Sequence, residues 1–171
     1  MVGACPTAIA RQAQSRFRDS LRQRGAQISA VFAFLHHLAA FTLVAALVVE
    51  FVLIRGDLTA TTARKIARAD MIFGISSGVL VIVGLLRVFY FEKGAAYYFH
   101  SGTFLAKLGL FILVGLLSIY PTMKFISWRK ALDPSSVPAI RRIIHLELVA
   151  VVFILLFAAL MADGIGYLGR S

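Results

Sequence analysis

Residues 71–91 read MIFGISSGVLVIVGLLRVFYF, and this stretch decides the class of fold. It contains a single charged residue, Arg87, close to its end. A helix rises about 1.5 Å per residue, so about 20 apolar residues are needed to cross the hydrocarbon core of a bilayer, which is about 30 Å thick. The stretch has this length, and it predicts a helix that spans a membrane.

Three more stretches of the same kind accompany it. They are ISAVFAFLHHLAAFTLVAALVVEFVLI at 28–54, TFLAKLGLFILVGLLSIYPTMKFI at 103–126 and IIHLELVAVVFILLFAALM at 143–161. None shows the alternation of apolar and polar residues that is typical of transmembrane β-strands. The chain is 60% hydrophobic and 15% charged, whereas soluble domains carry about 25% charged residues. We therefore predict an all-α integral membrane protein, built as a bundle of four transmembrane helices.

The predicted helices divide the chain into three parts. A basic segment at 1–27 precedes the membrane domain at 28–166, and a short tail follows at 167–171. The basic segment contains one acid, Asp19, and five arginines, namely Arg11, Arg16, Arg18, Arg22 and Arg24. This composition fits a helix that lies in the membrane interface or a disordered segment, and a targeting peptide is a further alternative.

The net charge of +10 is distributed in a way that indicates lipid. Basic residues gather between the apolar stretches, at 55–68 and 124–142, as well as in the first segment. Basic loops of this kind contact lipid headgroups, so we expect the bilayer as partner and do not expect binding to nucleic acid. The first and third loops carry most of the Lys and Arg, which predicts that they are cytoplasmic and that both termini face the other side. The basic N-terminal segment favours the reverse orientation.

Small residues recur on two of the predicted helices. Gly74 and Gly78 are four residues apart in the second, and Gly102, Ala106 and Gly109 lie along one side of the third. Small side chains let helix backbones approach closely in lipid. We expect these faces to pack inside the bundle, and a homo-oligomer interface is the alternative.

Ionisable side chains inside spans are costly and are candidates for function. One layer of them forms at the end where the first helix begins, comprising His36, His37, Arg87, His100, Lys107 and Asp163. Imidazole is a ligand for iron, copper or zinc. Adjacent histidines project about 100° apart on a helix, so we expect only one of His36 and His37 to face the core. Lys107 either reaches to the interface or pairs with an anion such as Asp163.

A second polar layer is expected at the opposite end. It comprises Glu50, Asp70, Lys124, His145 and Glu147. Glu147 lies early in the fourth helix, where a carboxylate interacts favourably with the helix dipole. A proton path or metal site formed by Glu50, His145 and Glu147 is a weaker alternative, since residues two apart do not share a helix face.

The sequence from 31 to 166 resembles known membrane families. The stretch Phe34-Leu35-His36-His37-Leu38-Ala39-Ala40 looks like the opening of the HemJ-type protoporphyrinogen oxidases and the CopD-like copper-resistance proteins, and Thr103-Phe104-Leu105-Ala106-Lys107-Leu108 is similar to a Trp-Leu-His-Val-Lys-Leu stretch of HemJ. The chain resembles most a family of predicted bacterial membrane proteins, domain of unknown function 2214. Leu105 stands where HemJ has a histidine.

The resemblance implies a HemJ/CopD-like four-helix bundle in the bacterial inner membrane that holds haem b, with His37 as the best axial ligand and Lys107 matching the HemJ lysine. It also implies a porphyrin or quinone-type redox partner. Our first hypothesis is therefore a haem or redox protein that uses His37, His100, Arg87 and Lys107. The second is a copper-handling protein with His36, His37, His100 and Met161 as ligands. The third is an accessory bundle without a cofactor.

Overall fold

The structure, a computed structural model, describes residues 6–91 and 102–163. Within those ranges it consists of helices: α1 (Pro6–Leu53), α2 (Ala60–Leu86) continued by the π-helix η1 (Arg87–Phe91), α4 (Gly102–Ser127), the short 3-10 helix η2 (Pro134–Ser136) and α5 (Val137–Ala162). Four of them are long and apolar enough to cross a membrane. The predicted all-α membrane fold with four spans is therefore confirmed.

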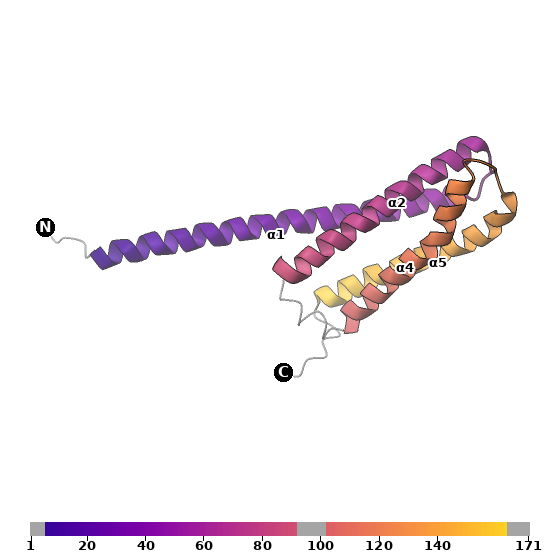
Figure 1. Cartoon of the computed structure of the whole chain (residues 1–171). Coiled ribbons are helices and arrows are strands. Elements are labelled where there is room, and N and C mark those ends of the chain that lie inside the picture. The colour runs from indigo at the N-terminus through magenta and orange to yellow at the C-terminus, as the bar shows by residue number, and fades with distance from the viewer. Residues whose placement is uncertain (1–5, 92–101, 164–171) are drawn as a thin grey trace.

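Helix α1 is much longer than the predicted first span. It begins at Pro6 rather than near residue 28 and runs for 48 residues, or about 70 Å, more than twice the thickness of a bilayer core. Alanine, glutamine and arginine form helices readily, and no proline interrupts residues 7–53. The structure gives residues 6–27 as helix, which fits the interfacial alternative, and binding of this part to the membrane interface stays a prediction. Figure 1 shows it extending beyond the other helices.

Two other helices also begin earlier than predicted. Helix α2 starts at Ala60 instead of residue 71, and α5 starts at Val137 instead of residue 143. The added turns carry Arg64, Lys65 and Arg68 in α2 and Arg141 and Arg142 in α5. Hydropathy excludes these basic residues from a span, although they are compatible with helix. The start of α2 is fixed by Thr59, whose hydroxyl accepts a hydrogen bond from the backbone N–H of Thr62 at 3.1 Å.

The four helices form two antiparallel hairpins, α1 with α2 and α4 with α5, as Figure 1 shows. The hairpins meet through contacts of α1 with α5 and of α2 with α4. We call the end with residues 54–59 and 128–136 the connector end, and the end where α2 finishes and α4 begins the open end. The larger buried cluster extends from the connector end into the bundle and includes Leu47, Ile66, Phe125 and Ile140. At the open end the cluster is small, with Val88 and Phe104 buried.

The outer surface of the bundle is apolar. Exposed side chains include Phe41, Ile82, Leu116 and Val152, which is the surface that a lipid-facing bundle presents. Gly74, Gly78 and Gly109 lie on this surface too, and a Cβ atom at any of them would meet nothing within 4 Å. The expectation that they pack inside the bundle is therefore wrong for these glycines.

Candidate functional sites

At the open end, the two adjacent histidines point in different directions. The ring of His36 is half-buried and packs against α2, with its Cε1 atom 3.4 Å from where a Cβ of Gly84 would lie. Its Nδ1 atom is buried and has no hydrogen-bond partner within the described residues. His37 is exposed, and its Nδ1 lies 2.6 Å from the carbonyl oxygen of Ala33. His36 is therefore the inward-facing histidine of the two, whereas His37, the axial-ligand candidate that the resemblance implies, faces outward.

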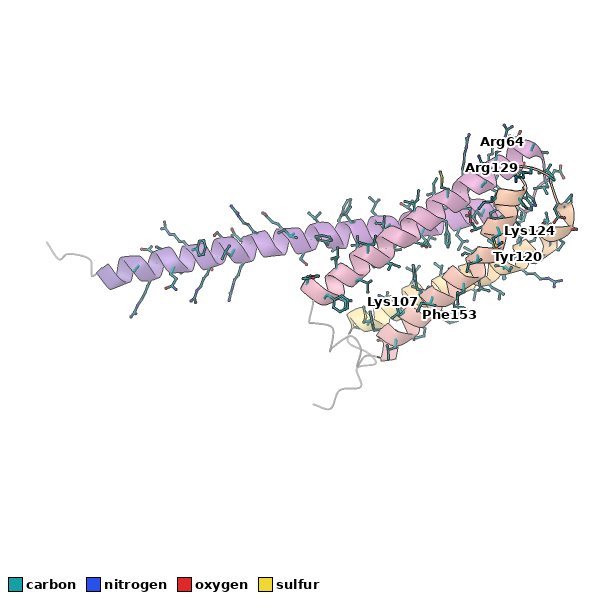
Figure 2. The ribbon with its side chains drawn as sticks, in the orientation of Figure 1. Arg64, Lys107, Tyr120, Lys124, Arg129 and Phe153 are labelled. Carbon is teal, nitrogen blue, oxygen red and sulfur yellow. The ribbon has the colours of Figure 1, made fainter. Side chains whose placement is uncertain are left out.

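Two cationic side chains from other helices accompany His36. Arg87 begins the π-helix η1, a widened turn of a kind often found at functional sites. Lys107 lies in the second turn of α4, half-buried, with Nζ 5.8 Å from the centre of the Phe104 ring. Both are close enough to His36 to interact electrostatically with it. Figure 2 shows Lys107 at this end of the bundle. Helices α1, α2 and α4 thus bring His36, Arg87 and Lys107, the open-end cluster, together.

The open-end cluster has the chemistry of an anion site. A guanidinium group, an amino group and an imidazole lie together beside apolar side chains, and within the described residues no carboxylate is within ion-pair distance of Lys107. Asp163, the expected partner of Lys107, is exposed at the end of α5. His100, the second predicted metal ligand, lies outside the described residues.

Near the connector end, three helices contribute one carboxyl group each. Glu50 of α1 and Glu147 of α5 are buried, each with only 2% of its surface exposed, and Asp70 of α2 is half-buried. Asp70 and Glu147 both interact electrostatically with Glu50. The fourth helix, α4, contributes hydroxyl groups: Ser118 Oγ lies 2.6 Å from Glu147 Oε1, and Thr122 Oγ1 donates to Asp70 Oδ1 at 2.7 Å. These five residues form the carboxyl cluster.

His145 does not belong to the carboxyl cluster. It is exposed, and its ring lies 6.0 Å from that of Phe51. Lys124 turns away too and donates to Asp133 Oδ2 at 3.0 Å. The hydrogen bonds from the Ser135 side chain and from Lys124 lower the pKa of Asp133 to about 2. The predicted layer of five polar residues thus separates into the carboxyl cluster and two peripheral groups.

Among residues 6–91 and 102–163, no group of three or more His, Cys, Asp and Glu side chains is arranged to hold a metal ion. The copper hypothesis placed ligands at His36, His37 and Met161, with His100 as the fourth. His36 and His37 diverge, and Met161 packs with the apolar cluster of Val88 and Phe104.

The fold and the two clusters define a multi-pass membrane protein with four spans and polar groups from several helices meeting inside it. The chain belongs to the family described as predicted membrane protein (DUF2214), whose model matches residues 28–166. The match leaves out the part of α1 that extends beyond the other helices. No curated protein and no solved structure matches the chain.

Reasoning from the sequence missed Ser118 and Thr122, and it placed Asp70 in the second polar layer but not in the candidate proton path. Asp70 immediately precedes an apolar stretch and follows Arg68, so it reads as part of a charged loop. Serine and threonine inside spans commonly bond to the carbonyl four residues earlier, so Ser118 and Thr122 drew no attention. A signal was nevertheless present: both lie on one face of the third apolar stretch, four residues apart.

Proposed function

We propose that this protein binds haem b at the open-end cluster and uses it in membrane redox or porphyrin chemistry. The observation that carries the proposal is the meeting of His36, Arg87 and Lys107 from three helices in an apolar setting. Among the described residues no carboxylate lies within ion-pair distance of the half-buried Lys107, and a ligand with negative charge would supply a partner for it. That ligand must also be amphiphilic, because Phe104 and Val88 are packed alongside.

The side chains present fit haem. His36 offers a buried imidazole nitrogen without a hydrogen-bond partner in the described part of the chain, suited to iron. Arg87 and Lys107 offer positive charge for the two propionates. His100, at a position outside the described residues, is the candidate second ligand. Haem supplies one-electron chemistry when bound, and the protein holds it, orients it and limits the access of water.

The test is an absorption spectrum of the protein purified in detergent after expression with a haem precursor. We expect a Soret band in the wild type. His36→Ala should lose most of this band, and His37→Ala, the matched control, should keep it because His37 is exposed. Arg87→Gln and Lys107→Gln should each weaken haem binding about ten-fold, or about 1.4 kcal/mol, whereas Lys130→Gln at the connector end should not.

Three outcomes count against the proposal. A wild type that shows no Soret band and takes up no added haem overturns it. Loss of the band in His37→Ala but not in His36→Ala would identify His37, the ligand that the resemblance implies, as the haem ligand. His36 would then have no role in binding iron. Equal spectra in all variants would favour an accessory bundle whose polar residues only anchor the helices.

A further inference from the structure

The side chain of Glu50 is the most unusual one in the bundle interior. It is buried, with 2% of its surface exposed, and its Oε1 atom has no hydrogen-bond partner within the described residues. The groups that face it from α2 and α5 are the carboxyl groups of Asp70 and Glu147. An ionised carboxylate in such a place would be both desolvated and repelled by its neighbours, which is strongly unfavourable. A carboxyl group without a counter-charge in this setting binds a cation or a proton.

The hydrogen bonds of Ser118 supply an independent indication. Its Oγ atom lies 3.0 Å from the carbonyl oxygen of Val114 and 2.6 Å from Glu147 Oε1. A hydroxyl group has one hydrogen, so it cannot donate fully to both oxygens. Both contacts are satisfied when Glu147 carries a proton and donates to Ser118 Oγ, while Ser118 donates to Val114. The geometry therefore accommodates a protonated Glu147.

We infer that Glu50, Asp70 and Glu147 form a proton-binding site that holds at least one proton and exchanges it with water at the connector end. Asp70 provides the route, because it is half-buried and lies two residues from exposed Arg68. Glu50 and Glu147 form the buried interior of the site. This proposal stands apart from the haem proposal, since Glu50 and His36 are about 20 Å apart along α1.

Within the described part of the chain, the charged groups around the cluster leave this site without a buried counter-charge. Arg141 of α5 donates to the carbonyl oxygen of Ile54 at 3.2 Å, and Arg55 lies over the ring of Phe51, 4.2 Å from its centre. Lys124 of α4 is paired with Asp133. His145 and Arg68 are exposed. The cations therefore lie around the connector end and not between the three carboxyl groups.

A metal ion is the competing occupant of a site made of carboxyl and hydroxyl oxygens. The three carboxyl groups do not converge closely enough to form a metal-binding group among residues 6–91 and 102–163. The hydroxyl groups of Ser118 and Thr122, both on α4, each form a hydrogen bond with one carboxyl oxygen, of Glu147 and Asp70 respectively. This arrangement suits protons, which need one oxygen at a time, better than a cation that requires six or more oxygens at once.

Infrared spectroscopy of the full chain in lipid vesicles tests the inference, because protonated and ionised carboxyl groups absorb at different frequencies. At pH 7 we expect a band of protonated carboxyl groups that shifts within minutes when water is exchanged for D2O. Glu50→Gln and Glu147→Gln should each remove part of it. Asp57→Asn, in the exposed connector between α1 and α2, is the matched control and should leave the band unchanged.

The wild-type spectrum alone can overturn the inference, so it does not depend on the variants folding. If the folded protein shows no protonated carboxyl band at pH 7, the three groups are ionised and the site does not hold a proton. A band that does not shift after hours in D2O means that the proton is sealed in and only structural. A band that disappears when Ca²⁺ or Mg²⁺ is added in place of chelator assigns the site to a cation instead.

Discussion

The two ends of the bundle are built on opposite plans. At the connector end the buried apolar cluster is large, and Phe125, Ile140 and Ile144 are almost completely buried. Among the described residues at the open end, Val88 and Phe104 form a smaller buried cluster, and Arg87 and Lys107 contribute basic side chains there. Among the described residues, close packing and buried polar groups therefore occur together, because the carboxyl cluster lies beside the larger apolar cluster and the open-end cluster beside the smaller one.

The largest expected effect comes from a cavity at the connector end. Phe125→Ala should lower the free energy of unfolding by about 3 kcal/mol, because Phe125 is 1% exposed and its ring lies 5.3 Å from that of Trp128. Phe104→Ala, at the open end, should cost clearly less, since its cluster is smaller. Unfolding in lipid bicelles measures both. Equal costs would show that the open end is packed as well as the other.

A bulkier residue in place of a glycine tests the open end directly. Gly84→Val should destabilise the pairing of α1 with α2 by about 1–2 kcal/mol, because a Cβ there already contacts His36 at 3.4 Å and the added methyl groups would displace the ring. Gly78→Val is the control, since its Cβ would meet open space. The same unfolding measurement applies. No difference between the two variants would mean that His36 can move away without cost.

A smaller effect is expected for a hydroxyl in the carboxyl cluster. Thr122→Val removes the 2.7 Å hydrogen bond to Asp70 while keeping the shape of the side chain. Hydrogen bonds between membrane helices contribute about 0.6 kcal/mol on average, so we expect a loss of that order. If Thr122 and Asp70 interact only with each other, then adding Asp70→Asn to the Thr122→Val variant should remove no further hydrogen bond. A loss above about 2 kcal/mol would show that Thr122 organises the whole cluster.

The smallest expected effect concerns pH at the connector end. Because the folded state lowers the pKa of Asp133 to about 2 from an ordinary 3.8, its hydrogen bonds stabilise the fold fully above pH 4. This contribution is lost as the pH falls from about 4 through 2. Unfolding measured between pH 6 and pH 2 should show a slight loss that Asp133→Asn does not show. An unchanged pH dependence in that variant would assign the loss to other carboxyl groups.

The class of fold was predictable because the four apolar stretches carry nearly all the information that it needs. Composition alone, however, could not place the starts of α2 and α5, since Arg64, Lys65 and Arg141 mark a boundary of hydropathy and not of helix. The same limit applies to α1, where a change from polar to apolar residues near Ile28 does not interrupt the helix. Helix formation and insertion into lipid follow different rules. The apolar stretches predict which residues enter the lipid, but they do not predict where a helix begins.

The sites were predicted less well than the fold. The sequence indicates how deep in the membrane a residue lies, but it does not indicate toward which neighbouring helix its side chain points. The sequence placed His36, Arg87 and Lys107 at one depth, and the structure has them close together. Choosing between His36 and His37 needed the rotation of α1, which depends on what α2 presents at Gly84. Likewise, Glu50 and Glu147 were assigned to one depth, but their relation to Ser118 and Thr122 depends on how the hairpins are paired.

The contact of Arg141 with the last turn of α1 has a consequence for biosynthesis. The carbonyl oxygen of Ile54 receives its hydrogen bond from a residue 87 positions later in the chain. A ribosome therefore delivers the first hairpin to the membrane long before that guanidinium, or Glu147, has been translated. Until the last helix arrives, the end of α1 and Glu50 must be accommodated by water, headgroups or an insertion factor, and a prematurely terminated chain would carry this unfinished surface as a mark for degradation.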